Sequence, residues 1–341
     1  MLLENSKVKL FRSKGYNYNF DKNTGFFMRW GQTVDENPEI APAPEILDLE
    51  ISEVCHGIKG KPCKWCYKSN TALGRNMSFD TFKQIFHRLP RNLTQIAFGL
   101  GTLSECPEFW KMAIYCRSND YNFVVPNITI NGDSLTDEQA NNLVDLCGAV
   151  SVSCYEPEDI CYDAVEKLTK YGLKQTNIHA LVAEQTYEKC MQVMKDSQTD
   201  PRLKDLNAIV FLALKPKGKR NDFTSISTEH YTNIINYALE NNIRVGFDSC
   251  SACAFNKITK DKFQEYAEPC ESYLMSLYIS VDGKSVPCSF LEGEEGYTEL
   301  DVLNCQDFIK DIWNSKAAKE WRTKLLANGR RCPHFNVLNG L

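Results

Sequence analysis

The chain has 341 residues, of which 43% are apolar, and a formal net charge of −5. This length suffices for one large domain of barrel size or two ordinary domains with hydrophobic cores. The lack of a long basic block argues against nucleic acid as the main partner, and no apolar run is long enough to cross a membrane. Fifteen cysteines, an odd number, and no signal-peptide pattern favour free thiols in a reducing cytoplasm over a disulfide framework.

Residues 1–45 are predicted to form an amino-terminal hairpin and a linker. Segments 16–20 and 26–30 flank a polar turn, and three prolines after the second segment indicate an extended connector. We expect the hairpin, with Arg29 and Trp30, to cover the bottom of the following domain rather than to recognise a peptide.

From residue 46, strand-like and helix-like segments alternate. Strands are predicted at 46–51, 95–98, 123–130, 149–154, 176–182, 208–214 and 244–247. Helices are predicted at 78–89, 107–117, 136–147, 158–171, 187–195 and 229–241, and Ser78 and Thr136 look like helix caps, the latter in a capping box with Gln139.

Such repetition predicts parallel strands joined by right-handed crossovers. Six repeats are too few to close an eight-fold barrel. We therefore predict an α/β fold with a partial (β/α)6 TIM-like barrel over residues 46–248, whose active site lies at the carboxyl ends of the strands.

The most informative motif directly follows the first predicted strand. Cys55, Cys63 and Cys66 lie on one loop with the spacing Cys-x7-Cys-x2-Cys. Three thiolates can hold three irons of a four-iron cluster, and the fourth iron can then bind a small molecule. We therefore predict an iron–sulfur site at the edge of the barrel where chemistry is expected.

A structural zinc site is the main alternative for this loop. Zinc takes four ligands, usually as two Cys/His pairs, whereas here a long gap precedes a single Cys-x2-Cys. His56 could be the fourth ligand, but it directly follows Cys55, which suits a tetrahedral site poorly.

The pattern changes after residue 248, where cysteines crowd together. A hairpin is predicted from 273–281 and 285–287, and two helices are predicted near 305–313 and 315–326. We predict that residues 249–341 form a small cysteine-rich carboxy-terminal domain of a β-hairpin and helices.

Two further features receive structural interpretations. The basic run 215–220 is predicted to be a solvated loop, with contact to an anionic substrate as the alternative. Six cysteines are predicted to be small apolar fillers in helices and strands: Cys106, Cys116, Cys147, Cys154, Cys161 and Cys190.

From residue 46 onward, these features together resemble the radical S-adenosylmethionine (SAM) enzymes, and the tail resembles their SPASM/Twitch extension. The family's common cluster spacing is Cys-x3-Cys-x2-Cys, so the first gap is longer here. The resemblance implies that Cys55, Cys63 and Cys66 hold a [4Fe–4S] cluster that binds SAM.

The resemblance also implies SAM contacts at the strand ends. The run from Gly99 through Gly101 to Thr102 resembles the family's Gly-Gly-Glu loop, with Thr102 in the place of the glutamate. Trp65 would pack beside the adenine or exclude water from the cluster. Ser153 would bond the ribose or only cap its strand.

Residues for acid–base chemistry stay undecided. Tyr155, Tyr231 and Lys215 are candidates, and nothing favours one of them. Asn131, at the third strand end, is expected to make a turn rather than to touch substrate.

In the tail, Cys270, Cys288 and Cys332 fit the Twitch pattern, with Gly283 permitting the hairpin turn between the first two. The resemblance implies one auxiliary [4Fe–4S] cluster rather than two. Cys250 is the preferred fourth ligand; the alternatives are Cys253, Cys305 or an open iron.

The resemblance implies a radical SAM oxidoreductase or maturase that forms a 5′-deoxyadenosyl radical and abstracts hydrogen from its substrate. A peptide or protein side chain that is crosslinked, epimerised or dehydrogenated is the first expectation, and a small metabolite the alternative. An iron–sulfur electron carrier is the least favoured class. A flavodoxin- or ferredoxin-type reductant is the expected partner.

Overall fold

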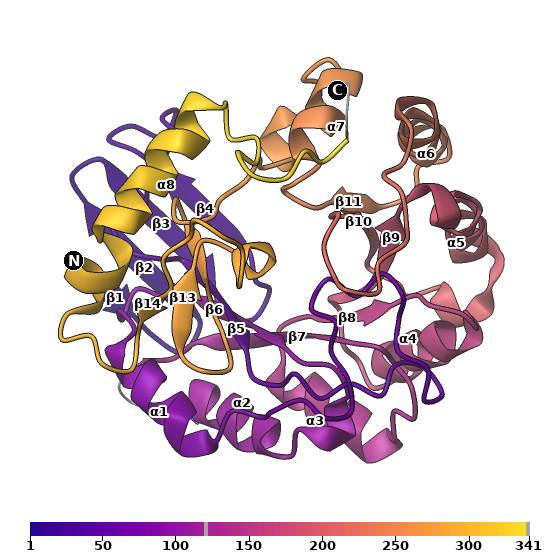
Figure 1. The fold of residues 1–341 in the computed structure, drawn as a ribbon, viewed down its shortest axis with the longest axis horizontal. Coiled ribbons are helices and arrows are strands. Elements are labelled where there is room, and N and C mark those ends of the chain that lie inside the picture. Colours follow the sequence, from indigo (N-terminus) through magenta and orange to yellow (C-terminus); the bar gives the residue numbers. More distant parts are fainter. Residues whose placement is uncertain (119–121, 339–341) are drawn as a thin grey trace.

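The described part of the chain folds into two sheets (Figure 1). A computed structural model describes residues 1–118 and 122–338. The first sheet is an antiparallel meander of four strands: β1 (Leu2–Glu4), β2 (Val8–Ser13), β3 (Tyr16–Asp21) and β4 (Phe27–Trp30). The predicted hairpin corresponds to β3 and β4, whereas the sequence analysis did not predict β1 and β2.

Lys9 explains both the location of this sheet and why β2 is hard to recognise. The most buried residue of β2 is this lysine, which inverts the usual apolar alternation. Its Nζ donates to the carbonyls of Leu93 (2.7 Å) and Phe123 (2.8 Å), just ahead of two barrel strands. Tyr18 likewise donates to the Asn92 carbonyl (2.5 Å). The sheet therefore covers the amino-terminal edge of the barrel, as expected for the hairpin.

The second sheet has ten strands in the order β11-β10-β9-β8-β7-β6-β5-β12-β13-β14. Seven consecutive parallel strands form the partial barrel: β5 (Ile46–Glu50), β6 (Gln95–Gly99), β7 (Val125–Ile130), β8 (Val150–Ser153), β9 (Thr176–Val182), β10 (Ala208–Ala213) and β11 (Val245–Phe247). All seven predicted strands are confirmed, and so is the predicted fold class.

Six helices connect these strands and cover their outer face (Figure 1). They are α1 (Phe79–Arg88), α2 (Glu108–Ser118), α3 (Asp137–Leu146), α4 (Asp159–Lys170), α5 (Tyr187–Thr199) and α6 (Thr228–Glu240). Ser78 accepts from Thr81 N, and Thr136 with Gln139 forms a reciprocal capping box, so both predicted caps are confirmed. Short 3-10 turns lie at η1 (Leu103–Glu105), η2 (Glu184–Thr186), η3 (Pro201–Leu203), η4 (Gln264–Tyr266) and η5 (Ser289–Leu291).

The tail continues the barrel sheet. Its strands are β12 (Ser276–Ile279), β13 (Lys284–Val286) and β14 (Leu300–Asp301), and its helices are α7 (Ala252–Ile258), the π-helix η6 (Phe308–Trp313) and α8 (Lys316–Ala327). The predicted hairpin is β12–β13, and β12 also pairs in parallel with β5. The domain boundaries remain a prediction, since the sheet runs through them without a break.

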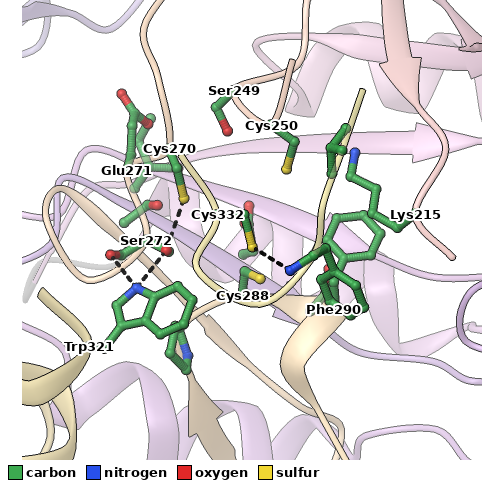
Figure 2. A pocket seen from close by; sticks show the side chains of 17 residues that line it. Lys215, Ser249, Cys250, Cys270, Glu271, Ser272, Cys288, Phe290, Trp321 and Cys332 are labelled. Atoms are coloured by element: carbon green, nitrogen blue, oxygen red, sulfur yellow. Dashed lines mark hydrogen bonds between the residues drawn. The ribbon is translucent and has the colours of Figure 1, made fainter. Parts of the chain in front are cut away.

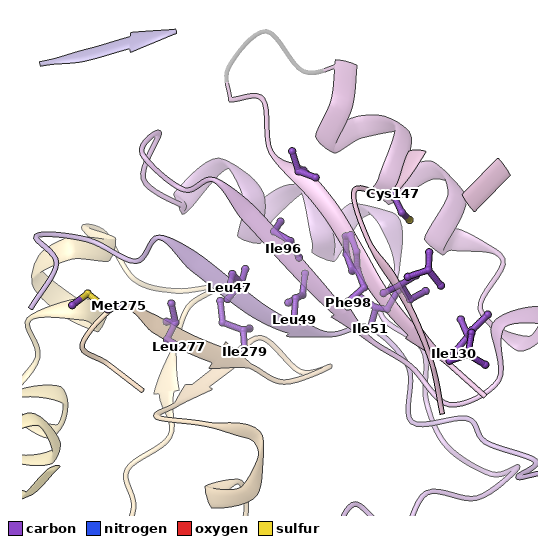
Figure 3. Packing of buried hydrophobic residues seen from close by; sticks show 14 of the residues in the cluster. Leu47, Leu49, Ile51, Ile96, Phe98, Ile130, Cys147, Met275, Leu277 and Ile279 are labelled. Carbon is purple, nitrogen blue, oxygen red and sulfur yellow. The ribbon is translucent and has the colours of Figure 1, made fainter. Parts of the chain in front are cut away.

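The hydrophobic core likewise spans barrel and tail (Figure 3). Leu47 and Leu49 of β5 lie between Ile96 of β6 and Leu277 of β12, and none of the four is more than 1% exposed. Because side chains alternate along a strand, Asp48 and Glu50 of β5 point to the opposite, inner face. The core side therefore holds the sheet together, while the inner face presents polar groups.

The six cysteines predicted as apolar fillers are buried members of this core, which confirms that interpretation. They are Cys106, Cys116, Cys147, Cys154, Cys161 and Cys190.

Candidate metal centres

The first cysteine set lies where the sequence places it, in the loop between β5 and α1 at the carboxyl edge of the sheet. Cys55, Cys63 and Cys66 are free and half-buried. Burial raises the pKa of Cys63 to about 12, and the neighbouring Cys55 and Cys66 add to the shift. Burial also raises the pKa of Cys55. Such mutually repelling thiols would ionise readily only next to cationic iron, so this donor set fits an iron–sulfur cluster.

The long first gap of the motif forms a tight turn. Ile58 and Lys61 pair as an isolated antiparallel bridge, and Lys59 and Gly60 between them both have positive φ angles of 49° and 76°. Lys59 N donates to Asp133 Oδ2 (2.7 Å) beyond the end of β7. The extra residues therefore fold back on themselves and are fastened to the barrel edge.

The glycine loop after β6 packs directly against this cysteine loop. A Cβ atom on Gly101 would lie 2.4 Å from the Cβ of Cys55, whereas one on Gly99 would meet nothing closer than 3.5 Å. Thr102 accepts from His56 N (3.0 Å) and donates its own backbone N–H to the Val54 carbonyl (3.0 Å). Thr102 thus fastens the cysteine loop, a role that the sequence did not indicate.

The predicted adenine and ribose residues gather at the same edge. The Trp65 ring packs between Tyr155 and Phe223, with ring centroids 5.3 Å and 5.0 Å away. Burial raises the pKa of Tyr155, and the Cys63 charge adds to this, while a hydrogen bond from Ser153 opposes it. Tyr155, beside Ser153, therefore contacts the cysteine loop through Trp65.

The other two acid–base candidates are less available. Tyr231 is fully buried on α6, where its ring packs against Phe247 of β11. Lys215 is buried and forms an ion pair with Asp248. Asn131 makes the expected turn by accepting from Asp133 N (3.1 Å), and also donates to the Gly57 carbonyl (3.3 Å).

The basic run 215–220 is not a solvated loop, so that prediction is wrong. Gly218, at φ +106°, lies so close to the cysteine loop that a Cβ atom would come within 2.3 Å of the Cys66 carbonyl oxygen. Arg220 donates to the carbonyls of Ser69 (3.1 Å) and Asn70 (2.9 Å). Its charge also lowers the pKa of Cys55 and Cys63, although burial outweighs this effect. The run covers the cysteine loop and places a cation beside it.

The second cysteine set lines one cavity of about 290 Å³ (Figure 2). All four proposed auxiliary ligands, Cys250, Cys270, Cys288 and Cys332, are in its wall. They come from four separate segments: the exit of β11, the approach to β12, the end of β13 and the carboxy-terminal tail. Only the tertiary fold brings these thiols together.

The cavity favours a bound cationic group. Burial raises the pKa of Cys250 to about 12, and the charges of Cys270 and Cys332 add to the shift, although Lys215 opposes it. Burial raises the pKa of Cys288 as well. Phe335 N donates to the Cys332 sulfur (3.3 Å), a contact that stabilises a thiolate. This donor set fits an iron–sulfur cluster.

The two alternative ligands lie outside this cavity. Cys253 contacts the Gly329 carbonyl through its sulfur (3.8 Å). The carbonyl of Cys305 accepts from Arg88 (2.8 Å), at the far side of the tail. The geometry therefore favours Cys250 as the fourth ligand.

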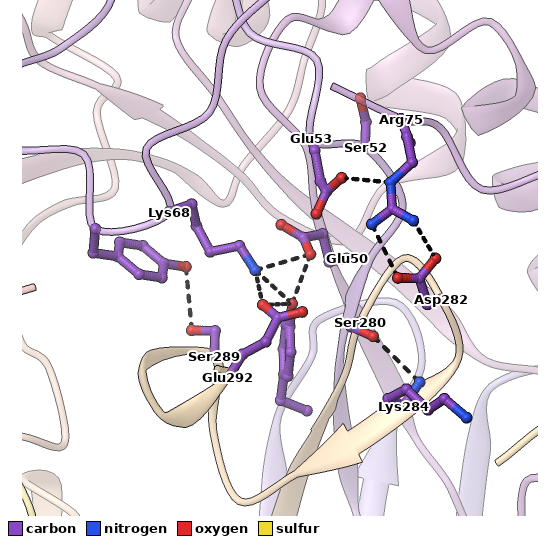
Figure 4. Close-up of polar contacts among 12 residues, drawn as sticks. Glu50, Ser52, Glu53, Lys68, Arg75, Ser280, Asp282, Lys284, Ser289 and Glu292 are labelled. Atoms are coloured by element: carbon purple, nitrogen blue, oxygen red, sulfur yellow. Dashed lines mark hydrogen bonds and ion pairs between the residues drawn. The ribbon is translucent and has the colours of Figure 1, made fainter. Parts of the chain in front are cut away.

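Polar contacts that the sequence did not reveal join the two sites (Figure 4). Lys68 bonds to Glu50 of β5 (2.9 Å), to Tyr278 of β12 (2.9 Å) and to Glu292 after η5. The sequence gives little indication of these contacts, because a single lysine in a loop is usually solvent-exposed.

Two features are absent from residues 1–118 and 122–338. No group of three His, Cys, Asp or Glu side chains is arranged to hold a single metal ion. No helix within residues 1–118 and 122–338 is long and apolar enough to cross a membrane.

Residues 270–334 match the family model described as an iron–sulfur cluster-binding SPASM domain. The chain therefore contains a SPASM domain over residues 270–334. Three of the cavity cysteines, Cys270, Cys288 and Cys332, lie within the match, while Cys250 precedes it. No curated protein sequence matches the chain significantly.

The complete fold, SPASM domain included, is similar to solved structures. SuiB of Streptococcus suis bound to the precursor peptide SuiA aligns with a TM-score of 0.72 at 11% identity, covering 95% of this chain and 91% of SuiB. SuiB bound to S-adenosylmethionine aligns at 0.71 and 11%, covering 94% and 90%. AnSMEcpe bound to AdoMet and the Cp18Cys peptide aligns at 0.60 and 18%, covering 84% and 86%. The expected fold, a partial α/β barrel with a cysteine-rich carboxy-terminal extension, is confirmed.

Proposed function

We propose that this protein is a radical SAM enzyme that oxidatively modifies a peptide or protein side chain. The observation that carries the proposal is the presence of two cysteine sites in one fold, three thiols on the loop after β5 and four around a cavity. A cluster on Cys55, Cys63 and Cys66 would cleave SAM reductively and supply a 5′-deoxyadenosyl radical.

The chain's own residues would orient SAM and exclude water. Gly101 has no side chain, so its backbone could approach an ammonium group closely, whereas the Gly99 carbonyl already accepts from Ile51 N (2.8 Å). Trp65, with Tyr155 and Phe223 beside it, would contribute apolar ring surface to the adenine site. Ser153 at the end of β8 would bond the ribose, and the run 215–220 shields the site.

A second cluster on Cys250, Cys270, Cys288 and Cys332 would accept an electron from the substrate, which makes net oxidation the favoured outcome. The similarity to SuiB bound to SuiA and to anSMEcpe bound to Cp18Cys supports a peptide substrate. A flavodoxin- or ferredoxin-type protein in the cytoplasm would supply the reducing electron.

Anaerobic reconstitution of the full chain tests the chemistry. We expect about eight irons per chain, from two four-iron clusters, and 5′-deoxyadenosine when SAM and a reductant are added. Cys66→Ala should abolish 5′-deoxyadenosine, and Cys250→Ala should lower the iron content. Cys253→Ala is the matched control, because this cysteine lies outside the cavity. Absence of 5′-deoxyadenosine from the iron-loaded chain would contradict the proposal.

The substrate class needs a separate experiment. Peptides encoded by short reading frames beside the gene should lose hydrogen on incubation with enzyme, SAM and reductant, as read by mass spectrometry. If such peptides stay unchanged while a small metabolite is dehydrogenated or rearranged, the small-molecule alternative holds instead.

A further inference from the structure

Tyr67 spans the space between the two cysteine sites. It directly follows Cys66, a ligand candidate of the first site, and its hydroxyl donates to Ser289 Oγ (3.1 Å) (Figure 4). Ser289 directly follows Cys288, a ligand candidate of the second site. One side chain and one hydrogen bond therefore connect the residues next to both candidate ligands.

Aromatic packing adds a second contact along the same line. The Tyr67 ring lies 4.3 Å from the Phe290 ring, centroid to centroid, with the planes tilted by 45°. The Phe290 ring also contacts Lys215, whose ammonium nitrogen lies 4.7 Å from the ring centroid. Phe290 itself lines the four-cysteine cavity. The path from the first loop to the cavity is thus continuous packed protein.

Neighbouring polar contacts hold both ends of this path in place. Lys68, which directly follows Tyr67, forms ion pairs with Glu50 (2.9 Å) and with Glu292. Lys217 donates to the Phe290 carbonyl (2.9 Å) and pairs with Glu294 (2.9 Å). A path whose ends are fixed keeps its contact distances, which is a requirement for reproducible electronic coupling.

We propose that Tyr67, with Ser289 and Phe290, is the route by which one electron passes between the two clusters. This inference rests on the proposed function, since both clusters must be present. In the step, one cluster is oxidised by one electron and the other is reduced by one; no bond forms or breaks and no proton moves. Tyr67 touches neither substrate nor SAM in this role and stays a neutral conduit.

A purely structural role is the competing explanation, because the same contacts would clamp the cysteine loop to the hairpin. The two explanations differ in what they predict for variants that keep the clamp partly intact. Tyr67→Phe keeps the ring against Phe290 and loses the hydroxyl, Ser289→Ala removes the acceptor, and Tyr67→Leu removes the ring.

The experiment follows electron exchange directly. Full-length protein carrying both clusters is reduced by a light flash with less than one electron per chain, and rapid freeze-quench EPR records how the electron redistributes. Cys66→Ala and Cys288→Ala provide the spectrum of each cluster without the other. Midpoint potentials and iron content are measured for every variant.

We expect redistribution to slow severalfold in Tyr67→Phe and Ser289→Ala and further in Tyr67→Leu, with both midpoint potentials unchanged. Tyr273→Phe is the matched control, because it loses a tyrosine–serine hydrogen bond of the same length (3.1 Å, to Ser285) outside the path. It should exchange electrons at the wild-type rate.

Wild-type rates in the Tyr67 and Ser289 variants would overturn the inference, and so would slowing that only follows a shift in midpoint potential. If Tyr67→Leu fails to load both clusters, Tyr67→Phe and Ser289→Ala decide. The proposed function fails independently: a wild-type chain that exchanges electrons but forms no 5′-deoxyadenosine would refute it and leave the route standing. A wild-type chain that loads a single cluster would overturn the inference, and formation of 5′-deoxyadenosine by that chain would still decide the proposed function.

Discussion

At the scale of single residues, the conformation of the Cys55–Cys66 loop depends on Gly101, which belongs to a different loop. Gly101 belongs to the loop after β6, yet the backbone and Cβ of Cys55 occupy the space that a side chain would need. Backbone atoms cannot move aside as a flexible side chain can. The glycine that resembles a SAM-binding signature therefore also shapes the cluster loop.

Gly101→Ala should displace Cys55 and lose the first cluster while keeping the auxiliary one. The new Cβ would lie 2.4 Å from both the Cys55 Cβ and the Val54 carbonyl oxygen. The iron content should fall from about eight to about four per chain, with loss of 5′-deoxyadenosine. Gly99→Ala is the control: its Cβ would meet nothing closer than 3.5 Å, and full iron content is expected. Equal iron loss in both variants would contradict this account.

At the scale of elements, the segment between β10 and α6 covers the first site. Its lysines and arginine find carbonyl and carboxylate partners on the cysteine loop and on the tail: Lys215 with Asp248, Lys217 with Glu294 and the Phe290 carbonyl, and Arg220 with the Ser69 carbonyl. A run of basic residues that looked solvated is thus a connecting element.

Gly218→Ala should detach this segment. The substitution meets the Cys66 carbonyl oxygen at 2.3 Å, in addition to the cost of a left-handed alanine, about 1–2 kcal/mol. Gly172→Ala has nearly the same φ, +105° against +106°, but open space around it. Limited proteolysis should cleave the segment 215–227 faster in Gly218→Ala and at the wild-type rate in Gly172→Ala. Similar cleavage of both variants would contradict this prediction, because it would show that backbone strain, and not the contact with Cys66, detaches the segment.

The amino-terminal sheet is fastened to the barrel by a buried cation. Lys9→Met would leave the carbonyls of Leu93 and Phe123 without their donor, so we expect the free energy of unfolding of the apoprotein to fall by roughly 3 kcal/mol. Lys7→Met, at an exposed position in the turn between β1 and β2, should have little effect. Denaturant unfolding measures both variants.

The stability difference between the wild type and Lys9→Met should depend on pH. Burial lowers the pKa of Lys9 from 10.5 to about 8 in the folded state. Between these pH values the unfolded chain binds more protons than the folded chain, so the stability of the wild type rises with pH relative to Lys9→Met. Below pH 8 the difference should be constant. Parallel stability curves from pH 7 to pH 10 would contradict the assigned pKa shift.

At the scale of the whole molecule, barrel and tail share one sheet, one core and one buried ion network. Tyr278 of β12 donates to Glu50 of β5 (2.7 Å) and to Glu292 (3.0 Å), and Lys68 neutralises both carboxylates. Lys68 and Glu50 are only 11% and 6% exposed. The two cysteine sites are therefore parts of one rigidly connected unit.

Lys68→Met should destabilise the apoprotein by about 3–5 kcal/mol, because it leaves the buried Glu50 and the partly buried Glu292 without their cation. Burial raises the pKa of Glu50 despite the opposing charge of Lys68. The destabilisation should therefore shrink as the pH falls and the carboxylates of the variant take up protons. Lys316→Met breaks an exposed pair with Glu320 and should change stability by less than about 0.5 kcal/mol. Chemical denaturation at pH 5 and pH 8 tests both.

The sequence predicted most of the architecture. Strand–helix alternation and capping residues identified the barrel, and the position of Cys55 after the first strand identified the first site, because these signals are local. Strand β2 was not predicted because its inward-facing residue is Lys9. The prediction of a solvated loop at 215–220 was wrong because the partners of this run lie on distant segments. The first of the two expected tail helices is a π-helix (Phe308–Trp313), a hydrogen-bond pattern that side-chain periodicity does not distinguish.

By itself, the sequence determined the fold class and the first cysteine loop, since periodicity and short-range spacing specify both. It named Cys270, Cys288 and Cys332 for the second site but left the fourth thiol open. Only the tertiary structure separated Cys250 from Cys253 and Cys305, and only it showed Tyr67 between the two sites. The physical reason is that these contacts join segments far apart in the chain, whose meeting is set by the pairing of β12 with β5.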